Sequence, residues 1–191
     1  MWDQGKSFCE ITLKNRQIQE LIHSTHRQYD LIVLEAYFGD CFVPFSKKFN
    51  APIIRIATFS GAPWMYDWVG NPTELSYVPD PFLHYTDKMT FCQRFWNVYT
   101  TFIYRFTRNY YHLPKLDSLV RRYYNEPEKL PRLWELEIES TSLLFVNTHF
   151  SISYPRPLLP NVIQIGGLHM KPPKELPQVR HCISVIVLPL H

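Results

Sequence analysis

The chain has 191 residues, of which 46% are hydrophobic and 16% aromatic, and its formal net charge at neutral pH is +3. This length and composition exclude a disordered tail and allow one sizeable core, as in a single domain or one lobe of a larger protein. The charge is small and the basic residues are scattered among acids, which argues against a nucleic-acid-binding protein.

The cysteines and the two ends of the chain further restrict the kind of protein that the sequence can encode. Cys9, Cys41, Cys92 and Cys182 show no CxxC pair or other metal-ligand spacing, so we expect buried free thiols rather than a zinc site or a disulfide framework. No metal or cofactor is predicted. The first residues carry no apolar signal-peptide core, and the apolar tail is shorter than the roughly 20 residues of a membrane-spanning helix.

Helical and strand patterns alternate along the chain, which is typical of a parallel sheet covered by helices. Apolar residues at helical spacing predict helices, and short apolar runs predict buried strands. In chain order, the expected elements are a helix over Phe8–His26, a strand over Tyr29–Leu34, a helix over Phe42–Phe49, a strand over Pro52–Ala57, a helix over Leu133–Ile138, and strands over Ser142–Val146 and Val162–Ile165.

A long aromatic insertion, residues 60–131, interrupts this rhythm, and insertions of this size usually carry function. Within it, Thr90 and Gln93 form a capping-box pattern at the start of a long helix. One face of that helix carries Phe91, Phe95, Tyr99, Phe102, Phe106 and Tyr110. We expect this face to pack in the core. The alternatives are the wall of an apolar ligand pocket or, with Arg94, Arg105 and Arg108 nearby, a surface that contacts lipid headgroups.

The chain carries several distinctive motifs in a fixed order. The most informative runs from Pro157 to His169, PLLPNVIQIGGLH, and a proline-rich connector ends at Pro177. Further motifs are Ser76–Pro79 (SYVP), Thr86–Phe91 (TDKMTF) and, upstream, the runs YDLIVLEA and FNAP. Together they resemble elements of the UDP-glycosyltransferase family of the animal type, most closely its insect members. The resemblance covers the chain from about Phe8 to Pro177.

The resemblance implies a GT-B fold of two Rossmann-like lobes, of which this α/β chain would be the latter part of the N-terminal, acceptor-binding lobe. In the family, a histidine near the N-terminus acts as general base on the acceptor hydroxyl, and an acid after a mid-lobe strand orients it. That histidine is expected upstream of Met1. The family's donor signature is absent from the sequence, so the UDP-sugar, which is a co-substrate, would bind to the other lobe.

Two residues compete for the role of the acid, both near the carboxyl end of a predicted strand, where open α/β sheets bind ligands. Glu35 falls at the position expected from the family, and a buried unpaired carboxylate in an apolar strand would be hard to explain structurally. Asp40 is the acid type usually found, but it is also a good helix N-cap. Glu35 is slightly favoured, and both remain candidates.

Aromatic residues of the insertion are candidates to line an apolar acceptor pocket: Trp64, Tyr66, Trp68, Phe82 and Tyr85. His149 and His169 are interpreted as hydrogen-bonded structural groups. Gly166 and Gly167 are interpreted as turn or hinge residues, because no phosphate-binding glycine motif surrounds them.

These observations divide the chain into a partial acceptor-binding lobe (1–165), the start of an interlobe linker (166–177) and a divergent tail (178–191). We expect a fragment of an enzyme that transfers a hexosyl group, most plausibly glucose, to a hydroxyl of a small lipophilic acceptor, and that is inactive alone. The alternative is a non-catalytic binding or interaction module that associates with itself or with full-length relatives. The resemblance implies the lumenal side of the endoplasmic reticulum membrane.

Overall fold

The computed structural model describes residues 2–124, 127–151, 153–168 and 170–171. Their centre is a four-stranded, fully parallel sheet in the order β1-β2-β3-β4. Its strands are β1 (Ile32–Glu35), β2 (Ile53–Ala57), β3 (Thr141–Val146) and β4 (Val162–Gln164). The predicted parallel α/β architecture is confirmed, and each predicted strand agrees with the observed one within a few residues.

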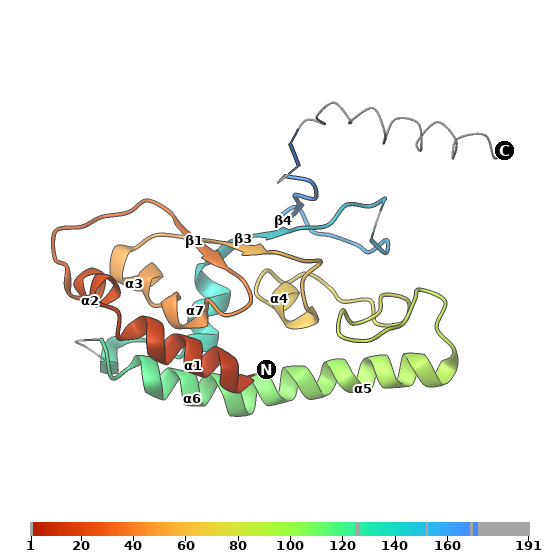
Figure 1. Cartoon of the computed structure of the whole chain (residues 1–191), viewed down its shortest axis with the longest axis horizontal. Helices are drawn as coiled ribbons and strands as arrows, with labels where there is room; N and C mark the ends of the chain where they lie inside the picture. Colours follow the sequence, from red (N-terminus) through yellow and green to blue (C-terminus); the bar gives the residue numbers. More distant parts are fainter. Residues whose placement is uncertain (1, 125–126, 152, 169, 172–191) are drawn as a thin grey trace, which may run out of the picture.

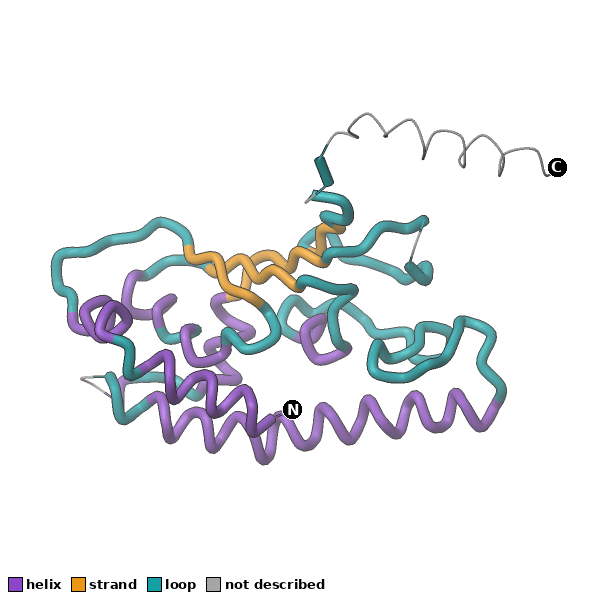
Figure 2. Tube along the Cα trace, in the orientation of Figure 1, coloured by secondary structure: helices purple, strands orange, loops and turns teal. Residues whose placement is uncertain are grey.

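Helices pack on one face of this sheet, in a near layer and a far layer (Figures 1 and 2). The α-helices are α1 (Trp2–Leu13), α2 (Arg16–His23), α3 (Phe45–Phe49), α4 (Pro63–Asp67), α5 (Phe91–Thr107), α6 (Leu113–Val120) and α7 (Leu133–Ser140). Short turns of 3₁₀-helix, η1 (Asp40–Phe42) and η3 (Pro127–Lys129), and one turn of π-helix, η2 (Arg108–His112), complete the set.

The alternation of side chains along the strands explains this one-sided packing. Ile53, Arg55 and Ala57 of β2 are buried toward the helices, whereas Ile54 and Ile56 between them are only partly buried. Because side chains point to alternate faces of a strand and paired parallel residues share a face, the register sets which residues of β1 face the helices. Leu34 pairs with Arg55 on the helix side, and Glu35 pairs with Ile56 on the other side.

Two predicted helices are each divided, for local reasons. The expected helix over Phe8–His26 is α1 followed by α2, because Asn15 ends the first helix and caps the second, with its Oδ1 accepting the Gln17 amide at 2.9 Å. The expected helix over Phe42–Phe49 is η1 followed by α3. Pro44 occupies the N-cap of α3, where the lack of an N–H costs no helical hydrogen bond.

The long helix of the insertion forms as predicted, but its aromatic face points outward. The capping box is confirmed: the Thr90 amide donates to Gln93 Oε1 at 2.8 Å, and the Gln93 amide donates to Thr90 Oγ1 at 3.4 Å. Phe91 and Phe95, however, are 83% and 58% exposed, and Tyr99, Phe102, Phe106 and Tyr110 are exposed as well. The expectation of core packing for this face was therefore wrong.

The reason is that the inward face of α5 carries polar side chains, which form hydrogen bonds with buried groups of the loop before the helix. Asn97, which is fully buried, donates to the carbonyls of Leu75 and Val78 at 2.9 and 3.0 Å and accepts from the amide of Asp80 at 2.8 Å. Thr101 Oγ1 donates to Asp80 Oδ2 at 3.1 Å. Leaving these buried loop groups unpaired would be costly, so the polar face of the helix is the one that packs.

A disulfide joins Cys9 of α1 to Cys41 of η1, with their Cα atoms 5.9 Å apart. The expectation of free thiols was wrong for this pair, because cysteines 32 positions apart carry no spacing signal and meet only when α1 packs beside the end of β1. Cys92 is free but exposed, and Cys182 lies outside the described residues. No helix within the described ranges has the length and apolarity needed to cross a membrane.

Candidate functional site

Glu35 ends β1 with its carboxylate exposed rather than buried. Its Oε2 accepts hydrogen bonds from the backbone amides of Tyr37 at 2.7 Å and Phe38 at 3.1 Å. The burial argument made for Glu35 from the sequence was therefore wrong, because the residue lies on the face of the sheet away from the helices. The two amides hold the carboxylate in one orientation and leave Oε1 without a hydrogen bond to any described residue.

A pocket of about 400 Å³ opens beside this carboxylate. It is formed where β1 and β2 end, and by a loop of the insertion, and its lining residues are Glu35, Tyr37, Phe38, Thr58, Phe59, Pro81 and Phe82. Its volume lies within the usual range for small-molecule sites, roughly 300–1,000 Å³. Its position at the carboxyl ends of parallel strands is the one that open α/β sheets use for ligands.

Aromatic rings pack against one another around this pocket. Phe82 stacks on Trp64 with centroids 5.9 Å apart, and it approaches Phe59 at 6.4 Å and Tyr104 at 5.5 Å. Tyr37 meets Phe59 edge-on at 5.9 Å. Burial raises the pKa of the Tyr37 hydroxyl, and Tyr104 and Glu35 add to the effect, so Tyr37 stays neutral at physiological pH and its phenol remains a hydrogen-bond donor.

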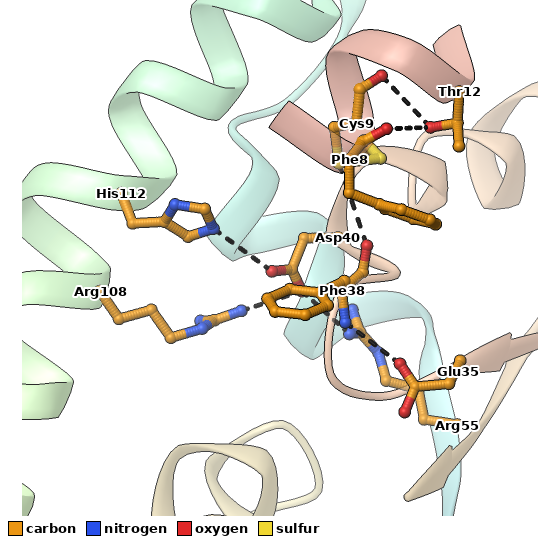
Figure 3. Close-up of a disulfide and its surroundings, with 10 residues drawn as sticks. Phe8, Cys9, Thr12, Glu35, Phe38, Asp40, Arg55, Arg108 and His112 are labelled. Atoms are coloured by element: carbon orange, nitrogen blue, oxygen red, sulfur yellow. Dashed lines mark hydrogen bonds and ion pairs between the residues drawn. A yellow bond between two sulfur atoms is a disulfide. The ribbon is translucent and has the colours of Figure 1, made fainter. Parts of the chain in front are cut away.

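Asp40, the second candidate acid, is buried on the helix side of the sheet. Its Oδ1 accepts from Arg55 Nη1 at 3.2 Å and from Arg108 Nη2 at 3.1 Å, and His112 Nε2 lies 3.8 Å from its Oδ2. Figure 3 shows Arg108 and His112 converging on it from one helical segment. The N-cap interpretation was wrong, because Gly39 occupies the cap of η1 and no side chain caps it.

A fourth charged residue completes this cluster. Glu137 of α7 accepts from Arg55 Nη2 at 3.3 Å and from Arg108 Nη2 at 2.6 Å, and all four side chains are at most 5% exposed. We refer to Asp40, Arg55, Arg108 and Glu137 as the charge quartet. Two acids and two guanidinium groups balance, as a buried ionic cluster requires.

The two acids of the quartet differ in proton affinity. Burial acts to raise the pKa of Asp40, but Arg108, hydrogen bonds with His112 and Glu137, and Arg55 outweigh it and hold this pKa well below its usual value. Burial raises the pKa of Glu137 to about 7 against the opposing effect of Arg108. Asp40 is therefore the firmly ionised member of the pair.

The residues predicted to line an acceptor pocket are only partly brought together. Phe82 lines the pocket beside Glu35, and the Trp64 ring stacks on the Phe82 ring. Tyr66 is buried and donates its hydroxyl to the Ser60 carbonyl, and Trp68 is buried with the Arg55 guanidinium 3.7 Å from its ring centroid. Tyr85 is half-buried, and its carbonyl accepts from the hydroxyl of Tyr154 at 3.5 Å.

Trp64 and Trp68 also line a second cavity of about 590 Å³, between α4, η2, α6 and α7. It shares no lining residue with the pocket beside Glu35. Arg108 and Glu137 of the charge quartet lie along its wall.

Sequence reasoning missed five residues that line the pocket beside Glu35, namely Tyr37, Phe38, Thr58, Phe59 and Pro81. The first four follow shortly after the end of β1 or β2. The rule that ligands bind beyond the carboxyl ends of strands could have found them.

The structure describes His149 and Gly167 but not His169. His149 is hydrogen-bonded, with its Nδ1 2.7 Å from Ser151 Oγ, and Gly167 forms a turn at a φ of 86°, so both predictions are confirmed. His169 lies outside the described residues. Within the described ranges, no group of three or more His, Cys, Asp or Glu side chains is placed to hold a metal ion.

The sequence of this chain is similar to those of known proteins. The family model described as "UDP-glucoronosyl and UDP-glucosyl transferase" matches residues 1–183. The chain is 40% identical over 171 residues to UDP-glycosyltransferase UGT4 of Dactylopius coccus, covering 87% of this chain and 33% of that protein. It is 34% identical over 125 residues to human 2-hydroxyacylsphingosine 1-beta-galactosyltransferase, covering 65% of this chain and 23% of that one.

A mammalian relative, UDP-glucuronosyltransferase 2A3 of Mus musculus, is 28% identical over 91% of this chain and 31% of its own length. The chain thus spans about a third of the relatives it matches along most of its length. No solved structure matches it. The four-stranded parallel sheet is accordingly part of a Rossmann-like GT-B lobe, and the chain belongs to the UDP-glucoronosyl and UDP-glucosyl transferase family.

Proposed function

We propose that this chain supplies the acceptor-binding part of a transferase that moves a hexosyl group, glucose, from a UDP-sugar to a hydroxyl of a small lipophilic acceptor. The observation that carries the proposal is the exposed carboxylate of Glu35, held by two backbone amides at the edge of an aromatic pocket. An aromatic wall favours an apolar acceptor.

Glu35 is the proposed acid of the reaction. Its free Oε1 can accept a hydrogen bond from the imidazole of a general base that the rest of the enzyme supplies. An ionised carboxylate in this place holds the imidazole in the correct tautomer and stabilises the imidazolium that forms when the acceptor hydroxyl loses its proton. Asp40 is not proposed for this role, because it is buried and occupied by guanidinium groups.

Tyr37, Phe59 and Phe82 are the proposed acceptor-binding side chains, with Trp64 fixing the ring of Phe82. Binding of a fused-ring phenol such as 1-naphthol to this chain, followed by quenching of intrinsic fluorescence, tests the proposal. Phe82→Ala should weaken binding about tenfold, because an aromatic contact is worth on the order of 1.4 kcal/mol. Phe95→Ala on the outer face of α5 is the matched control and should leave binding unchanged.

Catalysis is tested in a chimera in which this chain replaces the matching third of the insect relative UGT4. The chimera should glucosylate 1-naphthol from UDP-glucose, and Glu35→Gln should lower kcat by at least about 100-fold, as for loss of other groups that support a general base. The chain alone should bind neither UDP nor UDP-glucose and should show no turnover. Tight binding of UDP-glucose by the chain alone would contradict the proposal.

For localisation, we propose the lumenal side of the endoplasmic reticulum membrane. The Cys9–Cys41 disulfide supports an oxidising compartment, because such bonds are rare in the cytosol. Non-reducing gel analysis of the protein alkylated at the moment of cell lysis tests this point. A fully reduced pair in cells would contradict it.

A second function, a non-catalytic module that associates with itself or with full-length relatives, is favoured by one observation. The outer face of α5 exposes a continuous row of aromatic rings, and a large exposed apolar patch commonly marks an interaction surface. Sedimentation of the purified chain distinguishes the two functions. Association that Phe95→Ala and Phe102→Ala together abolish would support the module, and a monomer at micromolar concentration would oppose it.

A further inference from the structure

The segment from Glu35 to Cys41, called here the acid loop, has one open end and one anchored end. At the open end, the Glu35 carboxylate reaches the pocket and is held by the amides of Tyr37 and Phe38. At the other end, Asp40 and Cys41 are almost fully buried. The orientation of Glu35 therefore depends on where the backbone between these two ends is held.

The charge quartet holds Asp40 from two other parts of the chain. Arg55 comes from β2 and Arg108 from η2, and both also bind Glu137 of α7. The Arg55 guanidinium lies 3.7 Å from the centroid of the Trp68 ring, which covers it. Arg55 binds through two nitrogens of its planar guanidinium group, Nη1 to Asp40 and Nη2 to Glu137, so it sets position as well as charge.

The π-helical turn η2 places two side chains on Asp40 at once. The Leu113 amide donates to the carbonyl of Arg108, five residues earlier. A π-turn is wider than an α-turn and is common at functional sites. Arg108 and His112 both reach Asp40, at 3.1 and 3.8 Å. Trp2 stacks on His112 with ring centroids 5.1 Å apart.

Helix α1 fixes the acid loop from another side. The Cys9–Cys41 disulfide binds the residue next to Asp40. Gly5 packs directly on the loop, since a Cβ at that position would lie 2.9 Å from Cδ1 of Phe38. The same Phe38 donates its amide to Glu35.

The acid loop is also closely packed on itself. A Cβ at Gly39 would lie 2.2 Å from the backbone oxygen of Glu35. Gly39, the residue before Asp40, thus packs directly on the Glu35 backbone, so a shift of Asp40 is passed to the turn that presents the Tyr37 and Phe38 amides. Close-packed segments of this kind transmit displacement rather than absorbing it.

We propose that Asp40, through its ion pair with Arg108, is a positioning residue that fixes the acid loop so that Tyr37 and Phe38 orient the Glu35 carboxylate. The positioning of Glu35 is a statement about the fold, and its consequence for transfer rests on the function proposed above. The two candidate acids of this chain then act together: Glu35 lies at the pocket, and Asp40 anchors the loop that orients it.

Two charge-balanced double variants test this role. Asp40→Asn with Arg108→Gln removes the anchor and leaves the Arg55–Glu137 pair. Arg55→Gln with Glu137→Gln is the matched control. It also removes one basic and one acidic side chain of the charge quartet, but it leaves Asp40 bound to Arg108 and near His112. Hydrogen exchange of the Tyr37 and Phe38 amides is measured against the Ala36 amide, which donates to the Ile56 carbonyl within the sheet.

We expect the anchor variant, Asp40→Asn with Arg108→Gln, to speed exchange at Tyr37 and Phe38 at least about tenfold relative to Ala36. The control should change this ratio less than about twofold. The ratio reports local opening of the loop, because a loss of global stability speeds exchange at all three amides. Equal effects of the two variants would overturn the proposal and leave a purely structural role. If either double variant does not fold, Arg108→Lys, which keeps the charge but ends one bond short of the Nη2 atom that binds Asp40, should still raise the ratio about threefold. An unchanged ratio would overturn it.

The chimera separates this proposal from the proposed function. If the exchange ratio responds as expected and Glu35→Gln leaves the transfer rate unchanged, the positioning of Glu35 stands and its catalytic role fails. If Glu35→Gln abolishes transfer while the exchange ratio stays unchanged in the anchor variant, the catalytic role stands and the anchor fails.

Discussion

Glu35 and Asp40 are two carboxylates five positions apart that the fold treats in opposite ways. Glu35 lies on the open face of the sheet, exposed and held by backbone amides, whereas Asp40 lies on the helix side, buried among guanidinium groups. The difference shows that a residue's chemistry in a strand-end loop depends on which face of the sheet it reaches. An exposed, single carboxylate can serve a reaction, and a buried, paired one serves the structure.

The largest expected effect on stability comes from removing the charge of Asp40. Asp40→Asn should lower the free energy of unfolding by about 3–5 kcal/mol, because it leaves guanidinium charge uncompensated in the interior. Urea denaturation of the chain measures the change. A loss below about 1 kcal/mol would show that the buried cluster is not the anchor described here.

The disulfide should be the next largest contribution at the buried end. Replacing Cys9 and Cys41 together by serine should lower the free energy of unfolding by about 3–4 kcal/mol, as expected for a crosslink that closes a loop of a few tens of residues. The measurement is thermal or urea unfolding without reductant. Cys92→Ser, at an exposed free cysteine, is the control and should stay within about 0.5 kcal/mol of the unchanged protein.

A pH titration of stability sharpens the same contrast through Glu137. Its pKa is about 7 in the folded protein, against a usual value of 4.5. Between these values the folded state holds a proton that the unfolded chain has released, so the free energy of unfolding falls as the pH rises. From pH 4.5 to 7.5 the unchanged protein should lose on the order of 2–3 kcal/mol more than Glu137→Gln does. Parallel curves for the two proteins would contradict the raised pKa.

The smallest effect is expected at the open end. Glu35→Gln should change the free energy of unfolding by less than about 1 kcal/mol, because its carboxylate is exposed and the amide oxygen of glutamine can accept the same backbone hydrogen bonds. Urea denaturation beside Asp40→Asn gives the direct comparison. A loss as large as that of Asp40→Asn would mean that the two ends of the acid loop share one structural role.

Much of the fold could be predicted from local patterns, because those signals act over a few residues. The apolar runs that became β2 and β3, the Thr90 capping box and the turn at Gly167 all follow from backbone and side-chain chemistry within one element. The break at Asn15 also follows a local rule, N-capping, although the spacing of apolar residues concealed it. The family was recognised from ordered motifs between about Phe8 and Pro177, and the family model matches residues 1–183.

The candidate site was less predictable, since its geometry depends on residues far apart in sequence. The position of Glu35 at a strand end was visible in the sequence, but the face it occupies follows from the pairing of β1 with β2. Asp40 could not be recognised as an anchor, because its partners lie 15 to 97 positions away. Its burial is therefore a property of the assembled helices.

The sequence by itself determined the alternation of strands and helices and the long helix of the insertion, because local periodicity indicates them. It also determined the family, because ordered motifs indicate it. Only the tertiary structure decided which acid faces the pocket, which cysteines are joined and which face of α5 is buried. Aromatic spacing indicated a buried face there, but Asn97 and Thr101 face inward because they satisfy the buried groups of a loop. Burial of a polar group depends on partners that only the folded chain brings together.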